Sequence, residues 1–189
     1  LGATTTRRRA ATFRDDASFA AQWLRTAPEA PEAHHLLAML ALGDARYAEA
    51  VVHFEAALRG APDSPDLQTN LGVALAQLGR ETEARARLEE ALRDDPGHPE
   101  AHSARGALLA RAGRLDEAIE HHRAAVRAAP RLAAAHMNLG VALARAGRPD
   151  EAVFALREAV RLDPASVEAR RNLESALRAQ SGAAAAPAR

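Results

Sequence analysis

The sequence predicts an all-α solenoid, a fold in which pairs of helices stack one on the next. A 34-residue period runs through residues 31–166. Each period carries two stripes of apolar residues with helical spacing, and each stripe ends at a helix-breaking residue. In the last period the first stripe includes Leu139, Ala142 and Leu143, and Gly147 follows it. A repeat of this length with two helices in each period is stronger evidence than any local pattern, so we base the predicted fold on it.

The four periods predict eight helices in four helix–turn–helix units. The units are residues 31–64, 65–98, 99–132 and 133–166. We expect their helices near residues 31–43, 46–60, 65–78, 81–94, 99–112, 115–128, 133–146 and 149–162. Four units exceed the roughly three that are needed to bury a continuous core.

Shorter segments flank the four units. Residues 1–12 are polar and predict an extended arm, whose three consecutive arginines could bind an acidic partner or simply be solvated. Residues 13–30 are in phase with the second helix of an incomplete unit. Residues 167–180 predict a further first helix with a polar outer face, as a solubilising cap requires. Residues 181–189 show no helical pattern and predict a loose tail.

Two aromatic residues stand out in the segment before the first unit. Phe19 and Trp23 lie four residues apart and so share one face of the expected helix. Trp23 could close the open end of the core, because aromatic stripes usually belong to cores. The pair could instead contact another molecule, and a contact between copies that does not close would build filaments.

The units resemble tetratricopeptide repeats, and the resemblance rests on residues that recur at fixed positions. The Leu-Gly pair of that family appears as Leu71-Gly72 and Leu139-Gly140. The recurring small residues of the second helix and the closing prolines are Ala50, Ala84, Ala118 and Ala152, then Ala57, Ala91, Ala125 and Ala159, then Pro62, Pro96, Pro130 and Pro164. Where the family has Trp, this chain has His34, Gln68, His102 and His136. The resemblance implies a right-handed superhelix whose first helices line a concave groove.

The resemblance places a set of mainly polar side chains in that groove. They are His35, Thr69, Asn70, Ser103, Met137, Asn138 and Asn172, with Arg111 and Arg145 on the rim. An Asn amide both donates and accepts, so a row of them could bind the backbone of an extended peptide. This arrangement is similar to the Asn ladder of O-linked N-acetylglucosamine transferases, although Leu36 and Ala104 interrupt it. The alternative is that Asn simply suits a polar groove position.

The charged groove residues leave two further alternatives. Chaperone-binding members of the family clamp a C-terminal carboxylate, but only Asn70 matches the clamp, and Glu100 would repel a carboxylate. We therefore expect no clamp. Arg111 and Arg145 could favour an acidic ligand, or they could be a solvated helix face.

Composition and motifs argue against several other functions. The 25 basic residues are balanced by 25 acidic ones, which argues against a general nucleic-acid binder. The chain has no Cys, no phosphate-binding Gly loop and no metalloprotease motif, so we expect neither catalysis nor a cofactor. His34, His102 and His136 lie about one unit apart, too far to share a metal, and we expect them to pack between the two helices of a unit. No apolar run approaches the roughly 18 residues of a membrane span.

The leading hypothesis is a non-catalytic scaffold that binds an extended segment of a protein partner in its groove. One alternative is a structural protein that forms homo-oligomers or filaments through its terminal segments. Another is the targeting domain of a larger enzyme, which a chain beginning with Leu1 rather than Met leaves open.

Overall fold

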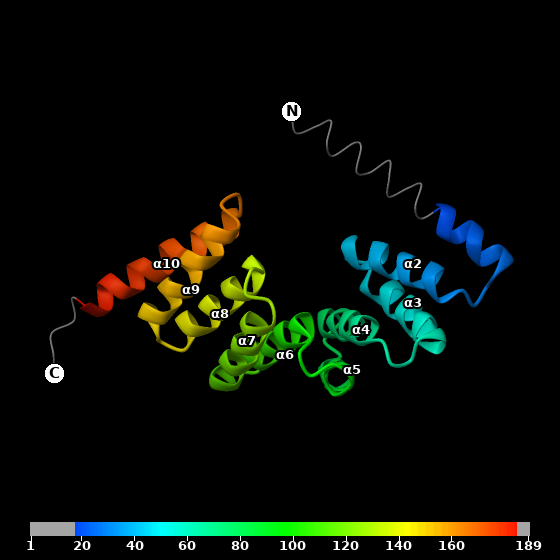
Figure 1. Ribbon diagram of the computed structural model, residues 1–189, viewed down its shortest axis with the longest axis horizontal. Helices are drawn as coiled ribbons and strands as arrows, with labels where there is room; N and C mark the ends of the chain where they lie inside the picture. Colours follow the sequence, from blue (N-terminus) through cyan, green and yellow to red (C-terminus); the bar gives the residue numbers. More distant parts are fainter. Residues whose placement is uncertain (1–17, 185–189) are drawn as a thin grey trace, which may run out of the picture. The chain divides into compact units, whose positions relative to one another are not determined.

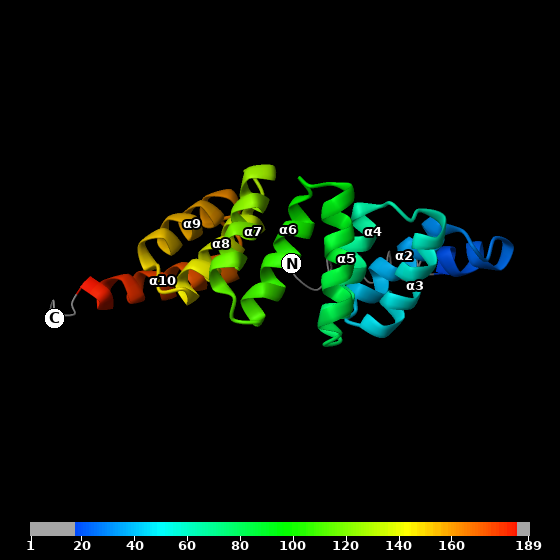
Figure 2. The same ribbon diagram turned by 90° about the horizontal axis from the view of Figure 1, so that it is seen from below.

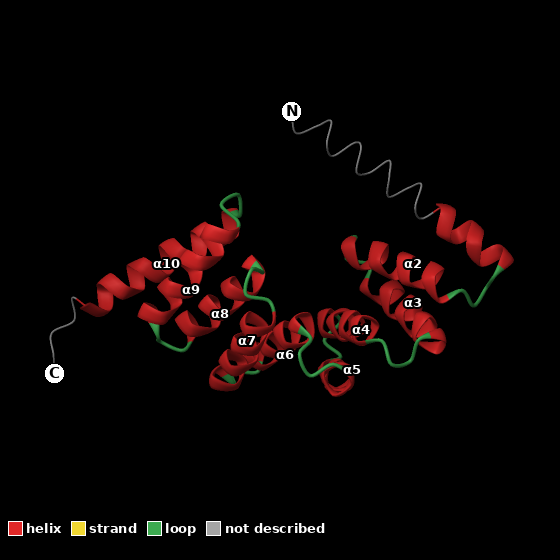
Figure 3. Cartoon of the chain, viewed as in Figure 1, coloured by secondary structure: helices red, strands yellow, loops and turns green. Residues whose placement is uncertain are grey.

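The computed structural model describes residues 18–184, and the regular elements in that range are all α-helices (Figure 3). The helices come in pairs: α2 (Pro31–Gly43) with α3 (Tyr47–Gly60), α4 (Pro65–Gln77) with α5 (Glu81–Asp94), α6 (Pro99–Arg111) with α7 (Leu115–Ala128), and α8 (Ala133–Arg145) with α9 (Pro149–Leu162). Residues 18–26 form a helix before the first pair, and α10 (Val167–Ala184) follows the last. The expected all-α class with repeated helix pairs is confirmed.

The chain divides into two compact units, Leu1–Asp95 and Pro96–Arg189. The first unit holds α2 to α5, and the second holds α6 to α10 (Figure 1). Within the second unit α8, α9 and α10 lie side by side in both views (Figures 1 and 2), and α10 packs mainly on α9. None of the described helices is both long enough and apolar enough to span a membrane.

The turn inside each pair needs a residue in the left-handed backbone region. Gly79, Gly113 and Gly147 occupy it with φ near 75°, while the first pair has Ala45 at φ 58°. The residue after this position donates its backbone N–H to a carbonyl in the last turn of the first helix, as Arg114 does to Leu109 over 2.9 Å. This bond is typical of the Schellman ending of a helix. Glycine adopts the conformation without strain, whereas a Cβ makes it costly.

The core of each pair is a small residue of the first helix facing a bulky residue of the second. A Cβ added to Gly72 would lie 2.9 Å from Cγ of Leu88, and one added to Gly140 would lie 2.5 Å from Cγ of Leu156. Leu88 and Leu156 are fully buried. The two helices therefore lie very close to each other at these positions. Such close packing is typical of protein interiors.

A recurring side-chain bond ties each pair to the turn before it. Four side chains at one repeat position bond the carbonyl oxygen of the proline six residues earlier: His34 to Pro28 (2.9 Å), Gln68 to Pro62 (3.2 Å), His102 to Pro96 (3.0 Å) and His136 to Pro130 (2.9 Å). The four prolines are exposed, so without these bonds their carbonyls could bond water, and each bond makes only a modest contribution to stability. The expectation that these histidines pack within their pairs is confirmed for His34 and His102, which also bond His53 and His121 of the second helices.

The last helix is longer than expected. We predicted its end at residue 180 and a loose tail from residue 181, but α10 continues to Ala184. Ser181 Oγ bonds the carbonyl of Leu177 (3.0 Å), and Gln180 Nε2 donates to Asp150 Oδ1 (2.8 Å), so the last turns are anchored. Alanine, which follows, has the highest intrinsic helix propensity.

The predicted arm, residues 13–17 of the partial unit and the last five residues lie outside the described residues.

We predict that Ala45→Gly stabilises the first helix pair. The substitution removes a Cβ from a left-handed position, and the gain should be about 1 kcal/mol in the free energy of unfolding after the added chain entropy is subtracted. Urea unfolding monitored by circular dichroism measures it. Gly113→Ala is the matched reverse change and should destabilise by a similar amount. An Ala45→Gly protein no more stable than the parent would contradict the assignment of strain to this turn.

Candidate binding site between α6 and α8

The second unit has a hollow of about 230 Å³ between two first helices, α6 and α8. Most of the side chains that line it come from these two helices, and α7 supplies one more at its floor. The lining residues are Ala107, Ala110, Arg111, His122, Asn138, Val141, Ala142 and Arg145. The hollow thus gathers three of the residues that the sequence assigned to the groove, namely Arg111, Asn138 and Arg145.

Two hydrogen bonds between the first helices hold the polar side chains of this hollow. Asn138 Nδ2 of α8 donates to Ser103 Oγ of α6 over 2.8 Å. One terminal guanidinium nitrogen of Arg145 donates to the carbonyl oxygen of Ala110 over 2.8 Å. Arginine has five N–H donors, so this bond orients the guanidinium and is compatible with a second partner. Asn138 and Arg145 are therefore positioned before any ligand binds.

His122 lies at the floor of the hollow and is the unusual residue of the site. It occupies the bulky position that is Leu88 or Leu156 in the neighbouring pairs, and it is only 3% exposed. A Cβ on Gly106 would lie 2.6 Å from its ring, so the imidazole packs directly on the backbone of α6. Its Nδ1 is buried and has no hydrogen-bond partner among the described residues. A polar atom in that position is costly unless something pairs with it.

The charged residues that line the hollow are of one sign. Its lining residues, all within the described range, include two arginines and no Asp or Glu. Burial, with a smaller contribution from the neighbouring His121, lowers the pKa of His122 to about 4. The imidazole is therefore neutral at pH 7 and carries one N–H donor.

The other residues assigned to the groove are placed differently. Thr69 is buried, at 3% exposed, so its side chain is not displayed on the surface. His35 stacks near Phe54, with ring centroids 6.4 Å apart. Met137 packs against the core of the second unit. Asn70 of α4 and Asn172 of α10 are half-buried, which leaves part of each side chain accessible.

The sequence analysis did not identify two features of the hollow. It did not single out His122, although a histidine at a position that holds leucine in two other repeats indicates a polar floor. It also missed the hydrogen bonds of Asn138 and Arg145, because nothing in the period says which side chain reaches the adjacent repeat.

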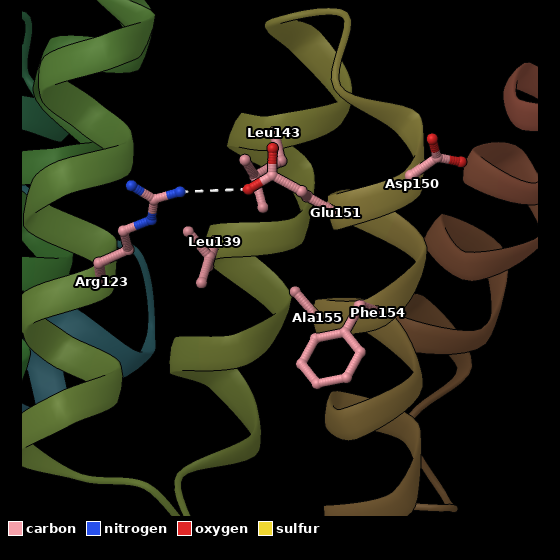
Figure 4. A pocket seen from close by; sticks show the side chains of 7 residues that line it. All are labelled: Arg123, Leu139, Leu143, Asp150, Glu151, Phe154 and Ala155. Atoms are coloured by element: carbon pink, nitrogen blue, oxygen red, sulfur yellow. Dashed lines mark hydrogen bonds and ion pairs between the residues drawn. The ribbon is translucent and has the colours of Figure 1, made fainter. Parts of the chain in front are cut away.

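A second hollow, of about 400 Å³, lies where α7, α8 and α9 meet (Figure 4). Figure 4 shows Arg123 of α7 and Glu151 of α9 reaching toward each other, and their ion pair measures 3.2 Å. Phe154 beside it is 79% exposed. Arg123 is already paired, and two acidic residues, Asp150 and Glu151, line this hollow, so it does not favour an anion.

A third hollow, of about 370 Å³, is lined by Phe19, Gln22, Trp23 and Thr26 in the helix of residues 18–26. The two aromatic rings lie with centroids 5.9 Å apart. Phe19 is 61% exposed, whereas Trp23 is partly buried. The residues predicted for self-association therefore share one partly open apolar surface.

The histidine pairs of the first and third repeats lie outside the hollows. The Nδ1 atoms of His34 and His53 are 3.0 Å apart, as are those of His102 and His121. Burial and the facing histidine lower the pKa of His53 and of His121. Within the described part of the chain, no group of three or more His, Asp or Glu residues is arranged to hold a metal ion.

Two family models match the chain, each described as tetratricopeptide repeat. One covers residues 41–108 and the other residues 98–165, so together they span both units. The chain is a tetratricopeptide repeat protein. Such repeats generally serve protein–protein interaction, and proteins built from them are generally scaffolds without catalytic activity. No curated protein matches the chain significantly in sequence.

Solved structures of tetratricopeptide repeat proteins are similar to the chain over most of its length. YrrB, described as a TPR protein with an unusual peptide-binding site, is 26% identical over 90% of this chain and 88% of its own, with a TM-score of 0.63. A thermophilic TPR protein of Thermus thermophilus, TTC0263, is 21% identical over 92% of this chain and 95% of its own, with a TM-score of 0.77. MamA of Desulfovibrio magneticus RS-1 is 23% identical over 80% of this chain and 92% of its own, with a TM-score of 0.61.

We predict that His122 makes this tetratricopeptide repeat protein less stable in acid. The folded pKa of His122 is about 4 and its unfolded value is 6.5, so the unfolded chain binds the proton more tightly between these values. The contribution of neutral His122 to the free energy of unfolding is fully present above pH 6.5. It is lost as the pH falls toward 4, and the loss is up to roughly 3 kcal/mol.

His122→Leu is the test, because Leu fills the same position in the second and fourth repeats. The variant should be more stable at pH 7 by about 1–3 kcal/mol, since a buried unpaired nitrogen is removed. It should also lose less stability than the parent between pH 6.5 and 4, as measured by urea unfolding at several pH values. Parallel pH profiles of the two proteins would contradict this role for His122.

Proposed function

We propose that the protein is a non-catalytic scaffold that binds an extended segment of a partner protein along its first helices. The observation that carries the proposal is the hollow between α6 and α8, where Asn138 and Arg145 are held in place by bonds to the adjacent first helix. Side chains that are ordered in advance lose little conformational freedom on binding, which favours affinity.

The chemistry of this face suits a peptide. Asn138 has an acceptor oxygen in addition to the amide that bonds Ser103, so its oxygen can accept a backbone N–H of the ligand. Val141 and the small residues Ala107 and Ala110 form apolar walls beside it. A small number of placed polar groups among apolar walls is typical of ligand sites. Asn172 of α10 extends the same repeat position within the second unit.

The likeness to YrrB supports the proposal, because that protein is described as having a peptide-binding site and its chain is 26% identical over 90% of this one. Other residues predicted for the groove belong to the same proposal. They are His35, Asn70, Ser103, Met137 and Arg111.

We predict that peptides of about 12 residues selected on the full chain from a random display library bind through the asparagines. The double variant Asn138→Ala, Asn172→Ala should weaken the binding of a selected peptide about tenfold, because two hydrogen bonds to the backbone are lost. Isothermal titration calorimetry measures the dissociation constants. Thr82→Ala, a change of an exposed residue on a second helix, is the control. Failure to enrich any peptide, or equal affinity for parent and double variant, would count against the proposal.

The second candidate function is self-assembly, and the observation that favours it is the surface of Phe19 and Trp23. An aromatic residue that is 61% exposed beside a hollow of about 370 Å³ offers both a projection and a recess. A surface with both can pair with its own copy about a two-fold axis. At the other end of the chain, α10 presents Arg170, Arg171 and Glu174 to solvent, so that end is polar.

We predict that, if the copies associate, light scattering on a sizing column gives a mass above 20.1 kDa that rises with concentration. Phe19→Ser should return the mass to 20.1 kDa, because the largest exposed apolar side chain of that surface is removed. Phe154→Ser is the control, since it removes a still more exposed ring on α9. A parent protein that stays at 20.1 kDa across the series would rule out association through this surface.

A further inference from the structure

We propose that two histidine pairs, His34 with His53 and His102 with His121, each bind one divalent transition-metal ion such as Zn²⁺ through their Nδ1 atoms. Each pair joins the first helix of a repeat to its second helix. A bound ion therefore links α2 to α3 in one unit and α6 to α7 in the other. These sites are separate from the proposed peptide site, because none of the four histidines lines the hollow between α6 and α8.

The first support is the distance between the two donor nitrogens of each pair. Nδ1 of His34 lies 3.0 Å from Nδ1 of His53, and the Nδ1 atoms of His102 and His121 are also 3.0 Å apart. With Zn–N bonds of about 2.0–2.1 Å, two nitrogens on one ion lie about 2.9 Å apart at a right angle and about 3.3 Å apart at the tetrahedral angle. The nitrogens of each pair are hydrogen-bonded in the structure, so metal binding requires the rings to turn until both lone pairs face the ion.

The second support is the hydrogen bond on the far side of each first-helix ring. His34 Nε2 bonds the carbonyl oxygen of Pro28 over 2.9 Å, and His102 Nε2 bonds that of Pro96 over 3.0 Å. Because a carbonyl oxygen only accepts, the hydrogen of each neutral ring is on Nε2, and Nδ1 keeps its lone pair. Histidines that bind a metal almost always donate their other ring N–H to such a partner, which fixes the tautomer and the orientation of the ring.

The second-helix rings supply the other ligand. His53 and His121 are half-buried, and burial, with a smaller contribution from the facing histidine, lowers the pKa of each ring from the ordinary 6.5. Both rings are therefore neutral at pH 7, the form in which imidazole binds metals. Moving the ring hydrogen from Nδ1 to Nε2 makes the Nδ1 lone pair available without loss of a proton.

The third support is the contrast with the other two repeats. The corresponding residues are Gln68 and Arg87 in the second repeat and His136 and Ala155 in the fourth. Gln68 makes the same bond to a proline carbonyl, so the turn does not require histidine. Ala155 is buried, so the second helix packs without a ring at that position. Packing alone therefore does not explain two histidines in one repeat, whereas a metal site with two nitrogen ligands requires both.

Carboxylates are not part of these sites. Glu49 and Glu117 lie one helical turn before the second histidine of each pair, but Glu49 is bonded to Arg46 and Glu117 to Arg114. The same ion pair recurs in the other two repeats, so it belongs to the turn. Within the described residues no group of three or more His, Asp or Glu is arranged around one ion. Water therefore completes the coordination, and an ion that binds the folded repeat through two helices stabilises it.

The test is isothermal titration of the full chain with zinc chloride at pH 7. We expect two ions per chain, one for each pair. The double variant His34→Gln, His102→Gln removes one ligand from each pair, and glutamine can keep the bond to the proline carbonyl, as Gln68 does. It should weaken zinc binding by more than about tenfold, because loss of even an outer hydrogen-bond partner of a ligand costs that much. The double variant His53→Ala, His121→Ala removes the opposite ligands and should give the same result.

His136→Gln is the matched control. His136 makes the same bond to a proline carbonyl, but its repeat has Ala155 at the position of the second histidine. This variant should therefore bind zinc as the parent does. Nitrogen-15 NMR of the histidine rings gives a second readout, in which zinc should shift the Nδ1 signals of the four paired histidines and leave those of His136 unchanged.

Three outcomes would overturn the proposal. They are absence of zinc binding by the parent, equal zinc affinity of the parent and both double variants, and a loss of affinity in His136→Gln as large as in the double variants. Circular dichroism of each variant checks that its helices are retained. Zinc should also raise the midpoint of thermal unfolding of the parent more than that of either double variant.

Discussion

The structure depends on one steric constraint, the close approach of the two helices within each pair. At Gly72 and Gly140 the first helix comes so near the second that a single added carbon would meet Leu88 or Leu156 at less than 3 Å. The bulky residue fills the space that the glycine leaves, so the pair is both tight and free of voids. The same contact occurs at Gly106 with the ring of His122, so it fixes the spacing of the two helices in three of the four pairs.

The same constraint produces the candidate site. The third pair keeps its glycine, Gly106, but places His122 where the others have an apolar side chain. The fold therefore tolerates a polar group at the centre of one repeat and presents it to the hollow between the first helices. In the third repeat, the residue that packs against the glycine of the first helix thus also lines the hollow.

The fold could be predicted from the sequence because the residues that determine it recur at fixed positions in each repeat. Apolar stripes, the Gly at three of the four turns and the closing prolines predict the helix pairs without any long-range information. The candidate site could be predicted only in part. Asn138, Arg111 and Arg145 follow from their repeat positions, but Thr69 shares such a position and is buried. Which side chain of a repeat stays accessible depends on its neighbour in the next pair, and the period does not encode that contact.

The end of α10 was missed for a related reason. At the residue where the helix was predicted to end, Gln180 donates a hydrogen bond to Asp150, a residue 30 positions earlier that no local pattern connects with it. Local patterning of the tail, with Gly182 and a run of alanines, is ambiguous between a loose chain and a helix.

The bonds to the proline carbonyls also fix where protons can reside. A carbonyl oxygen only accepts, so neutral His34 must carry its hydrogen on Nε2, and its Nδ1 must receive one from His53. One additional proton fits on the far nitrogen of His53 without breaking either bond. A further proton would set two N–H groups against each other across 3.0 Å. His102 and His121 repeat this arrangement, so the proline carbonyl at the end of each histidine pair fixes which ring nitrogens carry hydrogen.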